Sequence, residues 1–172
     1  MHKSAVGAVK LDLRTPLEVA SAYRALAADF GSSLTGVLVQ PMLAGGVEVV
    51  IGVVQEPVFG PVVVFGLGGA AAEVPGDHAA RLAPLTGADA DELIHAAHAA
   101  PLLSGHRGTP PVDTAALADA LLRVSRLADD LPEVAELDLS PVVAGPDGVC
   151  AVDVRVRVSP AEPTDRFLRR LR

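Results

Sequence analysis

The sequence predicts an α+β fold in which helices cover a mostly antiparallel sheet. Runs of β-branched residues are separated by short turns rich in Gly, Pro and Asp, as expected for strands that are joined by hairpins. Longer stretches repeat apolar residues at the helical period, which indicates amphipathic helices with one face to bury. Strands and helices of this kind pack as layers around a shared core.

The first helix is predicted to begin at Thr15-Pro16-Leu17-Glu18, where Thr15 can cap, Pro16 suits the first turn and Glu18 can complete a capping box. Its apolar stripe, which we expect to cover a sheet, ends near Gly31 and consists of Val19, Tyr23, Leu26 and Phe30. Further helices are expected at residues 88–99 and 113–130, with a loop at 101–111 between them. The last helix should bury Leu117, Leu121, Val124 and Ala128 and stop at Pro132.

Strands are predicted first at residues 36–40, 47–54 and 61–65, and the last two should form a hairpin. Their nearly continuous valines indicate burial on both faces of the sheet. Shorter strands follow at 70–74 and 78–85. A final hairpin should join strands 134–143 and 149–158 through a turn with Asp147-Gly148. In its second strand, the alternation predicts that one face is buried, consisting of Val152, Val154, Val156 and Val158.

Composition narrows the range of functions. The chain has 172 residues, of which 50% are apolar and only 3% aromatic, so its core must consist mainly of Val, Leu and Ala. A chain of this length forms about one domain. Fourteen Lys and Arg against twenty-one Asp and Glu give a net charge of −7, which disfavours nucleic acid and anionic membranes as partners.

The location predicted from the sequence is the cytoplasm. The most apolar stretch, residues 47–64, contains Glu48, Glu56 and two prolines, so it suits two strands rather than a membrane-spanning helix. The N-terminus lacks the apolar segment of a secretory signal. The single cysteine, Cys150, lies in a valine-rich run and is expected to pack as a small hydrophobic residue.

Asp138 and Asp153 are the carboxylates that the final hairpin would bring side by side, and Glu136 should share a face with Asp138. Such a cluster could bind one Mg²⁺ and, through it, a nucleotide phosphate. The alternative is that all three acids are ordinary solvent-facing residues of a hairpin.

Other polar positions have competing interpretations. Gly66-Leu67-Gly68-Gly69 could bring backbone N–H groups to a phosphate, or it could be a plain tight turn. Glu48 stands in an apolar strand, so it must face solvent or be paired. His2 and Lys3 could contact phosphates, but residues beside a chain terminus are more often solvated. His95 and His98 could ligate a metal, but no third ligand follows at helical spacing, so we interpret them as surface residues.

Taken in order, several segments closely resemble the ATP-grasp region of the NDP-forming acyl-CoA (acetyl-CoA) synthetases, a family related to the succinyl-CoA synthetase β subunit. These segments cover nearly the whole chain and are His2-Lys3-Ser4, residues 36–42, Gly46-Val47-Glu48, Phe59-Gly60-Pro61, residues 65–69, residues 81–85 and residues 136–142.

The resemblance implies an ATP-grasp fold in residues 1–158, followed by a tail at 159–172, and it implies a site for ATP and Mg²⁺. Gln40, Pro41 and Met42 correspond to the adenine-side hinge, and Glu48 to a carboxylate of the nucleotide pocket. Gly66, Gly68 and Gly69 belong to the family's glycine loop. Ser140 and Asp153 correspond to metal ligands, and Asp138 to an acidic catalytic position near the metal and an incoming phosphohistidine.

This sequence departs from the family pattern. The family usually has Asn at the place of Ser140, and a carboxylate at the place of Ala5. The resemblance also places the start of the chain inside the ATP-grasp domain, so that a phosphate-binding lysine strand and a CoA-binding domain with the phosphohistidine would lie elsewhere.

We therefore expect the nucleotide-binding part of an ADP-forming acyl-CoA (acetate–CoA) ligase that acts with missing domains or a partner chain and is inactive by itself. The alternative is a degenerate, non-catalytic ATP-grasp remnant with a regulatory or interaction role, derived from a fusion with an acetyltransferase.

Overall fold

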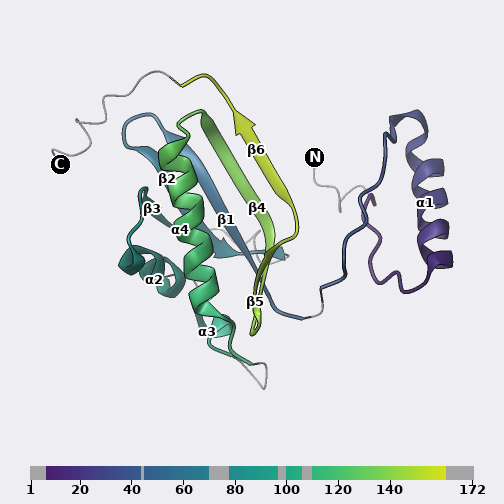
Figure 1. Ribbon diagram of the computed structural model, residues 1–172, viewed down its shortest axis with the longest axis horizontal. Coiled ribbons are helices and arrows are strands. Elements are labelled where there is room, and N and C mark those ends of the chain that lie inside the picture. The colour runs from purple at the N-terminus through teal and green to yellow at the C-terminus, as the bar shows by residue number, and fades with distance from the viewer. Residues whose placement is uncertain (1–6, 44, 70–77, 97–99, 106–109, 162–172) are drawn as a thin grey trace. The chain divides into compact units, whose positions relative to one another are not determined.

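The computed structural model describes residues 7–43, 45–69, 78–96, 100–105 and 110–161. The chain divides into two compact units, residues 1–44 and 45–172, which are described separately. The α+β class and the mostly antiparallel sheet predicted from the sequence are confirmed (Figure 1). Within the described residues, no helix is long and apolar enough to cross a membrane.

The N-terminal unit contains helix α1, Pro16–Phe30, which begins and ends as predicted. The Thr15 side chain accepts a hydrogen bond from the Glu18 N–H at 3.2 Å, and the Glu18 carboxylate accepts one from the Thr15 N–H at 2.9 Å. A short 3₁₀ turn, Gly31–Ser33, follows. Of the predicted apolar stripe, Leu26 is buried within this unit but Tyr23 is 51% exposed. That the stripe covers a sheet stays a prediction.

The strand predicted at residues 36–40 is wrong. Residues 34–43 run without assigned secondary structure, and Leu38 and Val39 are 84% and 68% exposed. A β-branched run becomes a strand only when another strand supplies hydrogen-bond partners, and the described part of this unit contains none.

The C-terminal unit is built on one antiparallel sheet with the strand order β3-β2-β1-β4-β5, and β6 also pairs with β4. The strands are β1 Val47–Glu56, β2 Gly60–Leu67, β3 His78–Leu82, β4 Val134–Gly145, β5 Gly148–Ala151 and β6 Val154–Val158. The β1–β2 hairpin is confirmed, with Glu56 opposite Gly60. The expected strand at 78–85 ends earlier, at Leu82, and the one expected at 70–74 lies outside the described residues.

Helices α2, Gly87–Ala96, and α4, Thr114–Asp130, lie over one face of this sheet (Figure 1). All four residues of the predicted α4 stripe are buried, as is Ser125 beside them. The loop predicted at 101–111 is wrong in its first part, because α3, Ala100–Leu103, occupies it and buries Leu103. Residues 106–109 of the predicted loop lie outside the described residues.

The core lies between the helices and one face of the sheet. Val49, Ile51, Val53, Val63 and Phe65 are fully buried there and pack with α2 and α4. Apart from the buried Gly66, their alternate neighbours on the other face are only half-buried or exposed, and Val54 is 49% exposed. The prediction that both faces are buried is therefore wrong for this unit as described.

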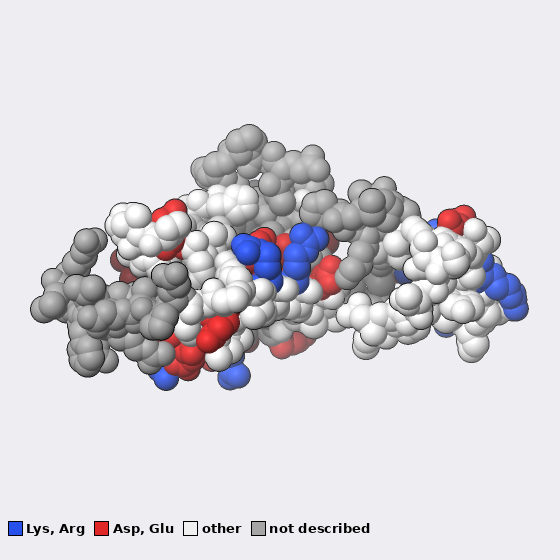
Figure 2. All heavy atoms as spheres, turned by 90° about the horizontal axis from the view of Figure 1, so that it is seen from above, with Lys and Arg blue, Asp and Glu red and all other residues white. Residues whose placement is uncertain are grey.

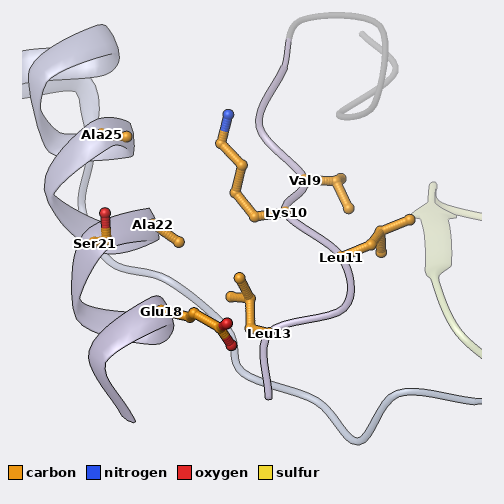
Figure 3. A pocket seen from close by; sticks show the side chains of 8 residues that line it. All are labelled: Val9, Lys10, Leu11, Leu13, Glu18, Ser21, Ala22 and Ala25. Atoms are coloured by element: carbon orange, nitrogen blue, oxygen red, sulfur yellow. The ribbon is translucent and has the colours of Figure 1, made fainter. Parts of the chain in front are cut away.

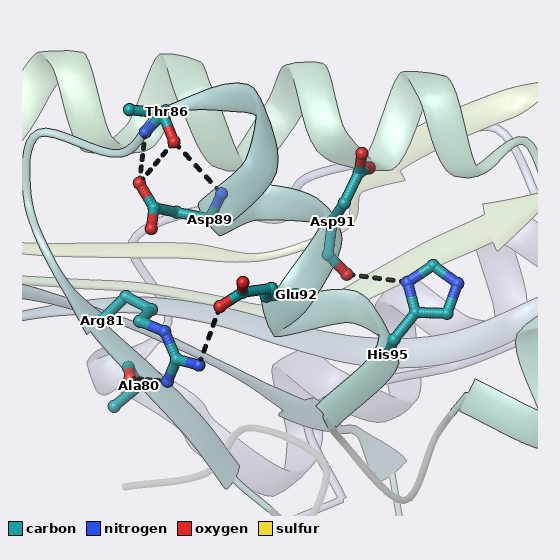
Figure 4. A network of polar contacts seen from close by, with 7 residues as sticks. All are labelled: Ala80, Arg81, Thr86, Asp89, Asp91, Glu92 and His95. Carbon is teal, nitrogen blue, oxygen red and sulfur yellow. Dashed lines mark hydrogen bonds and ion pairs between the residues drawn. The ribbon is translucent and has the colours of Figure 1, made fainter.

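Polar contacts tie α2 to the preceding strand (Figure 4). The side chain of Arg81 in β3 forms an ion pair with Glu92 in α2 at 3.2 Å. Thr86 and Asp89 cap the helix start, since each accepts a hydrogen bond from the other's backbone N–H. His95 is exposed and its Nδ1 lies 2.7 Å from the Asp91 carbonyl oxygen, as suits a surface histidine, whereas His98 lies outside the described residues.

The predicted final hairpin is confirmed, but its second strand is divided into β5 and β6 at Val152-Asp153. The alternation in β6 does not bury its valines: Val154, Val156 and Val158 are 54%, 48% and 67% exposed. Cys150 is exposed as well, contrary to the packed position expected for it. These residues belong to the outermost strands at their edge of the sheet. An apolar side chain there is buried only if another layer of the protein packs over it.

Candidate functional site

The face of the sheet away from α2 and α4, called the open face below, gathers most of the polar residues that the sequence singled out. Residues that pair across antiparallel strands share a face. Glu48, Gly52 and Val54 of β1 lie opposite Val143, Asp138 and Glu136 of β4. Asp138 and Glu136 in turn lie opposite Arg155 and Arg157 of β6. Figure 2 shows basic and acidic side chains gathered together near the middle of the surface in view.

Ser140 and Asp153 are brought next to each other by the backbone. The Ser140 N–H donates to the Asp153 carbonyl oxygen at 3.2 Å, at the point where β5 gives way to β6. Asp153 Oδ1 accepts a hydrogen bond from the Val154 N–H at 3.1 Å. Both residues, and Asp138 two positions before Ser140, are half-buried. Two carboxylates and a hydroxyl therefore lie within two residues of one another across neighbouring strands.

Glu136 is engaged by a basic side chain. Its carboxylate accepts a hydrogen bond from Arg157 Nε at 3.1 Å in a cross-strand ion pair. Glu136 is thus paired within the chain, while Asp138 lies one step along the same face, opposite Arg155.

The glycine segment lies against Glu48. Gly66 pairs with Val50 within the sheet, and the Gly68 N–H donates to the Glu48 carbonyl oxygen at 2.8 Å. A Cβ at Gly68 would lie 3.1 Å from backbone atoms of Glu48 and Val49, so the close approach of the two segments favours glycine. Gly69 has a φ of +62°, and a Cβ there would lie 2.5 Å from Glu48 Oε2. The Glu48 side chain is exposed, which is one of the two environments expected for it.

The other predicted site residues belong to the N-terminal unit, which is described by itself. Gln40, Pro41 and Met42 are exposed in the N-terminal unit, and Met42 is 54% exposed. His2 and Lys3 lie outside the described residues.

The donor chemistry on the open face suits a hard divalent cation. Carboxylate and hydroxyl oxygens are the ligands that Mg²⁺ takes in proteins, with water and phosphate completing its shell. Asp138, Asp153 and Ser140 supply such oxygens. Among the residues that the structure describes, no three His, Cys, Asp or Glu side chains form a metal-binding group by themselves, so a cation here would depend on the Ser140 oxygen or on a ligand's own atoms.

Sequence reasoning missed the two arginines of β6. The signal was present: counting outward in register from the Gly145–Gly148 pair places Ser140 opposite Asp153, Asp138 opposite Arg155 and Glu136 opposite Arg157. The alternation of valine and charged residues in this strand predicts only which face is buried. It does not by itself identify Arg155 and Arg157 as the residues opposite Asp138 and Glu136.

The N-terminal unit has hollows of its own. One of them is a shallow, open hollow of about 430 Å³ between α1 and the segment that precedes it (Figure 3). Its charged side chains are Lys10 and Glu18. Backbone N–H groups of Arg14 and Thr15 bind the Glu18 carboxylate and lower the pKa of that group, so this carboxylate is already used as a helix cap. The chemistry of the chain therefore points to the open face.

Comparison with known proteins identifies relatives of one kind. The chain is 40% identical over 161 residues to the acetate–CoA ligase [ADP-forming] I subunit beta of Pyrococcus furiosus, and covers 69% of that protein. It is 43% identical to the acetate–CoA ligase [ADP-forming] I of Archaeoglobus fulgidus, of which it covers 23%. The match includes 91% of this chain in both cases.

Solved structures agree. The fold matches dinucleotide forming acetyl-coenzyme A synthetase 1 of Ca. Korarchaeum cryptofilum with a TM-score of 0.83 and 43% identity, over 92% of this chain and 71% of that one. That protein was solved with coenzyme A and Mg-AMPPCP, its phosphohistidine segment pointing towards the nucleotide binding site.

The family model for the ATP-grasp domain matches residues 1–158, and the relatives above are ADP-forming acetate–CoA ligases or a subunit of one. The resemblance seen in the sequence is thereby confirmed, and the chain belongs to the ATP-grasp domain family.

Proposed function

We propose that this chain is the part of an ADP-forming acyl-CoA ligase that binds Mg²⁺ and ATP, and that the nucleotide phosphates lie on the open face of the sheet. The observation that carries this proposal is the adjacency of Asp138, Ser140 and Asp153 at the β4–β6 edge, with the arginines of β6 beside them. The solved relative that holds Mg-AMPPCP supports it, because it has the same fold at 43% identity.

In this proposal each residue has a distinct role. Asp153 and Ser140 bind Mg²⁺, which when bound neutralises phosphate charge. Asp138 lies beside them at the end of the site where the phosphoryl group leaves. The glycine segment of Gly66, Gly68 and Gly69 lies next to the phosphates, beside Glu48. The N–H that it offers them is that of Gly69, because the Gly68 N–H is bonded to the Glu48 carbonyl oxygen. That Gln40, Pro41 and Met42 of the N-terminal unit contact the adenine stays a prediction from the family resemblance.

The proposed partner is a CoA-binding domain or subunit that carries a phosphohistidine. Two relatives support this partner: the Pyrococcus furiosus protein is named as a beta subunit, and the Korarchaeum protein was solved with a phosphohistidine segment pointing towards its nucleotide binding site. Since the chain covers 69% of that beta subunit and 23% of a single-chain ligase, complete turnover is proposed only for the assembled enzyme. The chain alone, given ATP, Mg²⁺, acetate and CoA, should form no acyl-CoA above background, and robust turnover would contradict the need for a partner.

Calorimetric titration of the full chain tests the nucleotide site directly. Mg-ATP should bind, and binding should weaken at least tenfold in Asp153→Ala, because losing a carboxylate ligand removes a charge-assisted contact. Asp91→Ala is the matched control, since it removes an exposed carboxylate from α2, on the helix-covered side of the sheet. Equal binding by both variants would overturn the proposed metal site.

A specific observation keeps the second candidate, a non-catalytic remnant, in view: Ser140 stands where the family usually has Asn. A hydroxyl is a shorter and weaker ligand than an amide carbonyl. Absence of any Mg-ATP binding by the native chain would favour the remnant.

A further inference from the structure

Two acid–base pairs lie side by side across β4 and β6, and they differ in one respect. Glu136 faces Arg157 and Asp138 faces Arg155, in the same antiparallel register. The outer pair is closed, with Arg157 Nε 3.1 Å from the Glu136 carboxylate. In the part of the chain that the structure describes, no hydrogen bond or ion pair joins Asp138 to Arg155. The inner pair is therefore open.

An open pair at this position offers a carboxylate to the metal ion and a guanidinium to the phosphate oxygens of a metal-bound polyphosphate. Directly opposite residues have Cβ atoms only about 5 Å apart, close enough for an arginine and an aspartate to meet without strain. Asp138 instead adjoins Ser140 and Asp153, where the acidic groups favour a cation. Arg155 is exposed on the same face, and its guanidinium presents a fork of N–H donors that fits phosphate oxygens.

Arg157 is a poorer candidate for the same contact. It shares the strand, the face and the charge of Arg155, but Glu136 already neutralises it and occupies its Nε donor. A phosphate would have to compete with that carboxylate. The two arginines thus form a natural comparison within one strand.

We propose that Arg155 binds the terminal phosphate oxygens of the Mg²⁺-bound nucleotide and so acts as a phosphate-binding residue of the site. This inference rests on the proposed function, because it needs nucleotide on the open face. The class of ligand recognised by Arg155 is a metal-bound polyphosphate, whatever its base.

The experiment compares Arg155→Ala with Arg157→Ala in the full chain, by calorimetric titration with Mg-ATP, Mg²⁺-tripolyphosphate and AMP. Arg155→Ala should weaken Mg-ATP and tripolyphosphate at least tenfold, because a charge-assisted bidentate contact is lost, and should leave AMP unchanged. Arg157→Ala should change the polyphosphate affinities less than threefold. Arg155→Lys, which keeps the charge but not the fork, should fall between wild type and Arg155→Ala.

The outcomes separate this inference from the function on which it rests. If wild type fails to bind Mg-ATP, both are overturned. If wild type binds but the two alanine variants bind equally well, or AMP weakens as much as Mg-ATP, the role of Arg155 alone is overturned. Circular dichroism and melting temperature check folding, and Arg155→Gln, which keeps a polar side chain without the charge, replaces Arg155→Ala should that variant not fold.

Discussion

The carboxylate of Glu48 lies directly against Gly69: a methyl group at Gly69 would sit 2.5 Å from Glu48 Oε2. One residue earlier, the Gly68 N–H donates to the Glu48 carbonyl oxygen at 2.8 Å. A Cβ at Gly69 would therefore displace the Glu48 carboxylate, and a Cβ at Gly68 would press on the backbone of Glu48 and Val49.

Gly69→Ala should displace the Glu48 carboxylate and strain the backbone. Its φ of +62° is unfavourable for residues with a Cβ, so we expect a loss of about 1–2 kcal/mol in the free energy of unfolding. Denaturant unfolding measures this loss, with Gly87→Ala as control because a Cβ there meets nothing within 4 Å. In the background of Glu48→Ala the steric part of the penalty should disappear and the backbone part remain. An unchanged stability of Gly69→Ala would contradict this account.

Ser125→Ala should destabilise the C-terminal unit by about 1–3 kcal/mol, because it leaves the N–H of Leu85 without its partner. The hydroxyl of Ser125 is 1% exposed and accepts that hydrogen bond at 2.7 Å. Ser104→Ala is the control, since its hydroxyl donates to the Ala100 carbonyl oxygen at an exposed position. Equal unfolding free energies for the two variants would show that the buried hydrogen bond contributes nothing.

The fold could be predicted from the sequence where an element is defined by its own periodicity or pairs with a segment next to it in the chain. The stripe of α4 is buried because helical periodicity places Leu117, Leu121, Val124 and Ala128 on one face. The β1–β2 hairpin was predictable because its turn and both strands are adjacent in sequence. Burial of Val154, Val156 and Val158 was not, because it depends on whether another layer extends over the edge of the sheet.

The site divides in the same way. The neighbourhood of Asp138 and Asp153 followed from a local hairpin, whose register survives the break at Val152-Asp153. The closed state of one acid–base pair and the open state of the next depend on side-chain positions that no sequence pattern encodes. The approach of Gly69 to Glu48 depends on contacts between β1 and the end of β2, and only coordinates show it.

Stability should fall in acid, in part through the cap of α2. The Asp89 carboxylate accepts two hydrogen bonds from Thr86, one from the hydroxyl at 2.6 Å and one from the N–H at 2.8 Å. These two hydrogen bonds lower the pKa of Asp89. A group with a lowered folded pKa stabilises the fold above its unfolded pKa, and this contribution is lost as pH falls through the folded pKa. Asp89→Asn should thus reduce stability at neutral pH and match wild type at low pH. Thermal melts across the acid range measure this, with Asp91→Asn as control, and parallel profiles for wild type and Asp89→Asn would contradict it.

Cys150 should react with a thiol reagent in the folded protein. It is the single cysteine of the chain and is exposed on β5, opposite Val143, which in turn lies opposite Glu48 on the open face. Titration with Ellman's reagent should therefore yield one thiol per chain without denaturant, at a rate near that of the unfolded chain. A thiol that reacts only after unfolding would mean that Cys150 is covered in solution.

Ser140→Asn should distinguish a weakened nucleotide site from a remnant. The Ser140 N–H donates to the Asp153 carbonyl oxygen, so the two residues are neighbours. An asparagine at position 140 would present its side-chain carbonyl oxygen next to the proposed cation. Because an amide carbonyl reaches further than a hydroxyl and is a better ligand, we expect the affinity for Mg-ATP to rise about tenfold, since one improved hydrogen-bond or ligand contact to a charged group is worth about that factor. Ser140→Ala, which removes the ligand altogether, should lower it. The affinity for ATP without Mg²⁺ should be equal in all three proteins, because the change acts through the cation. If neither wild type nor Ser140→Asn binds Mg-ATP, the chain is a remnant. If wild type binds and neither substitution alters the affinity, residue 140 does not contact the cation.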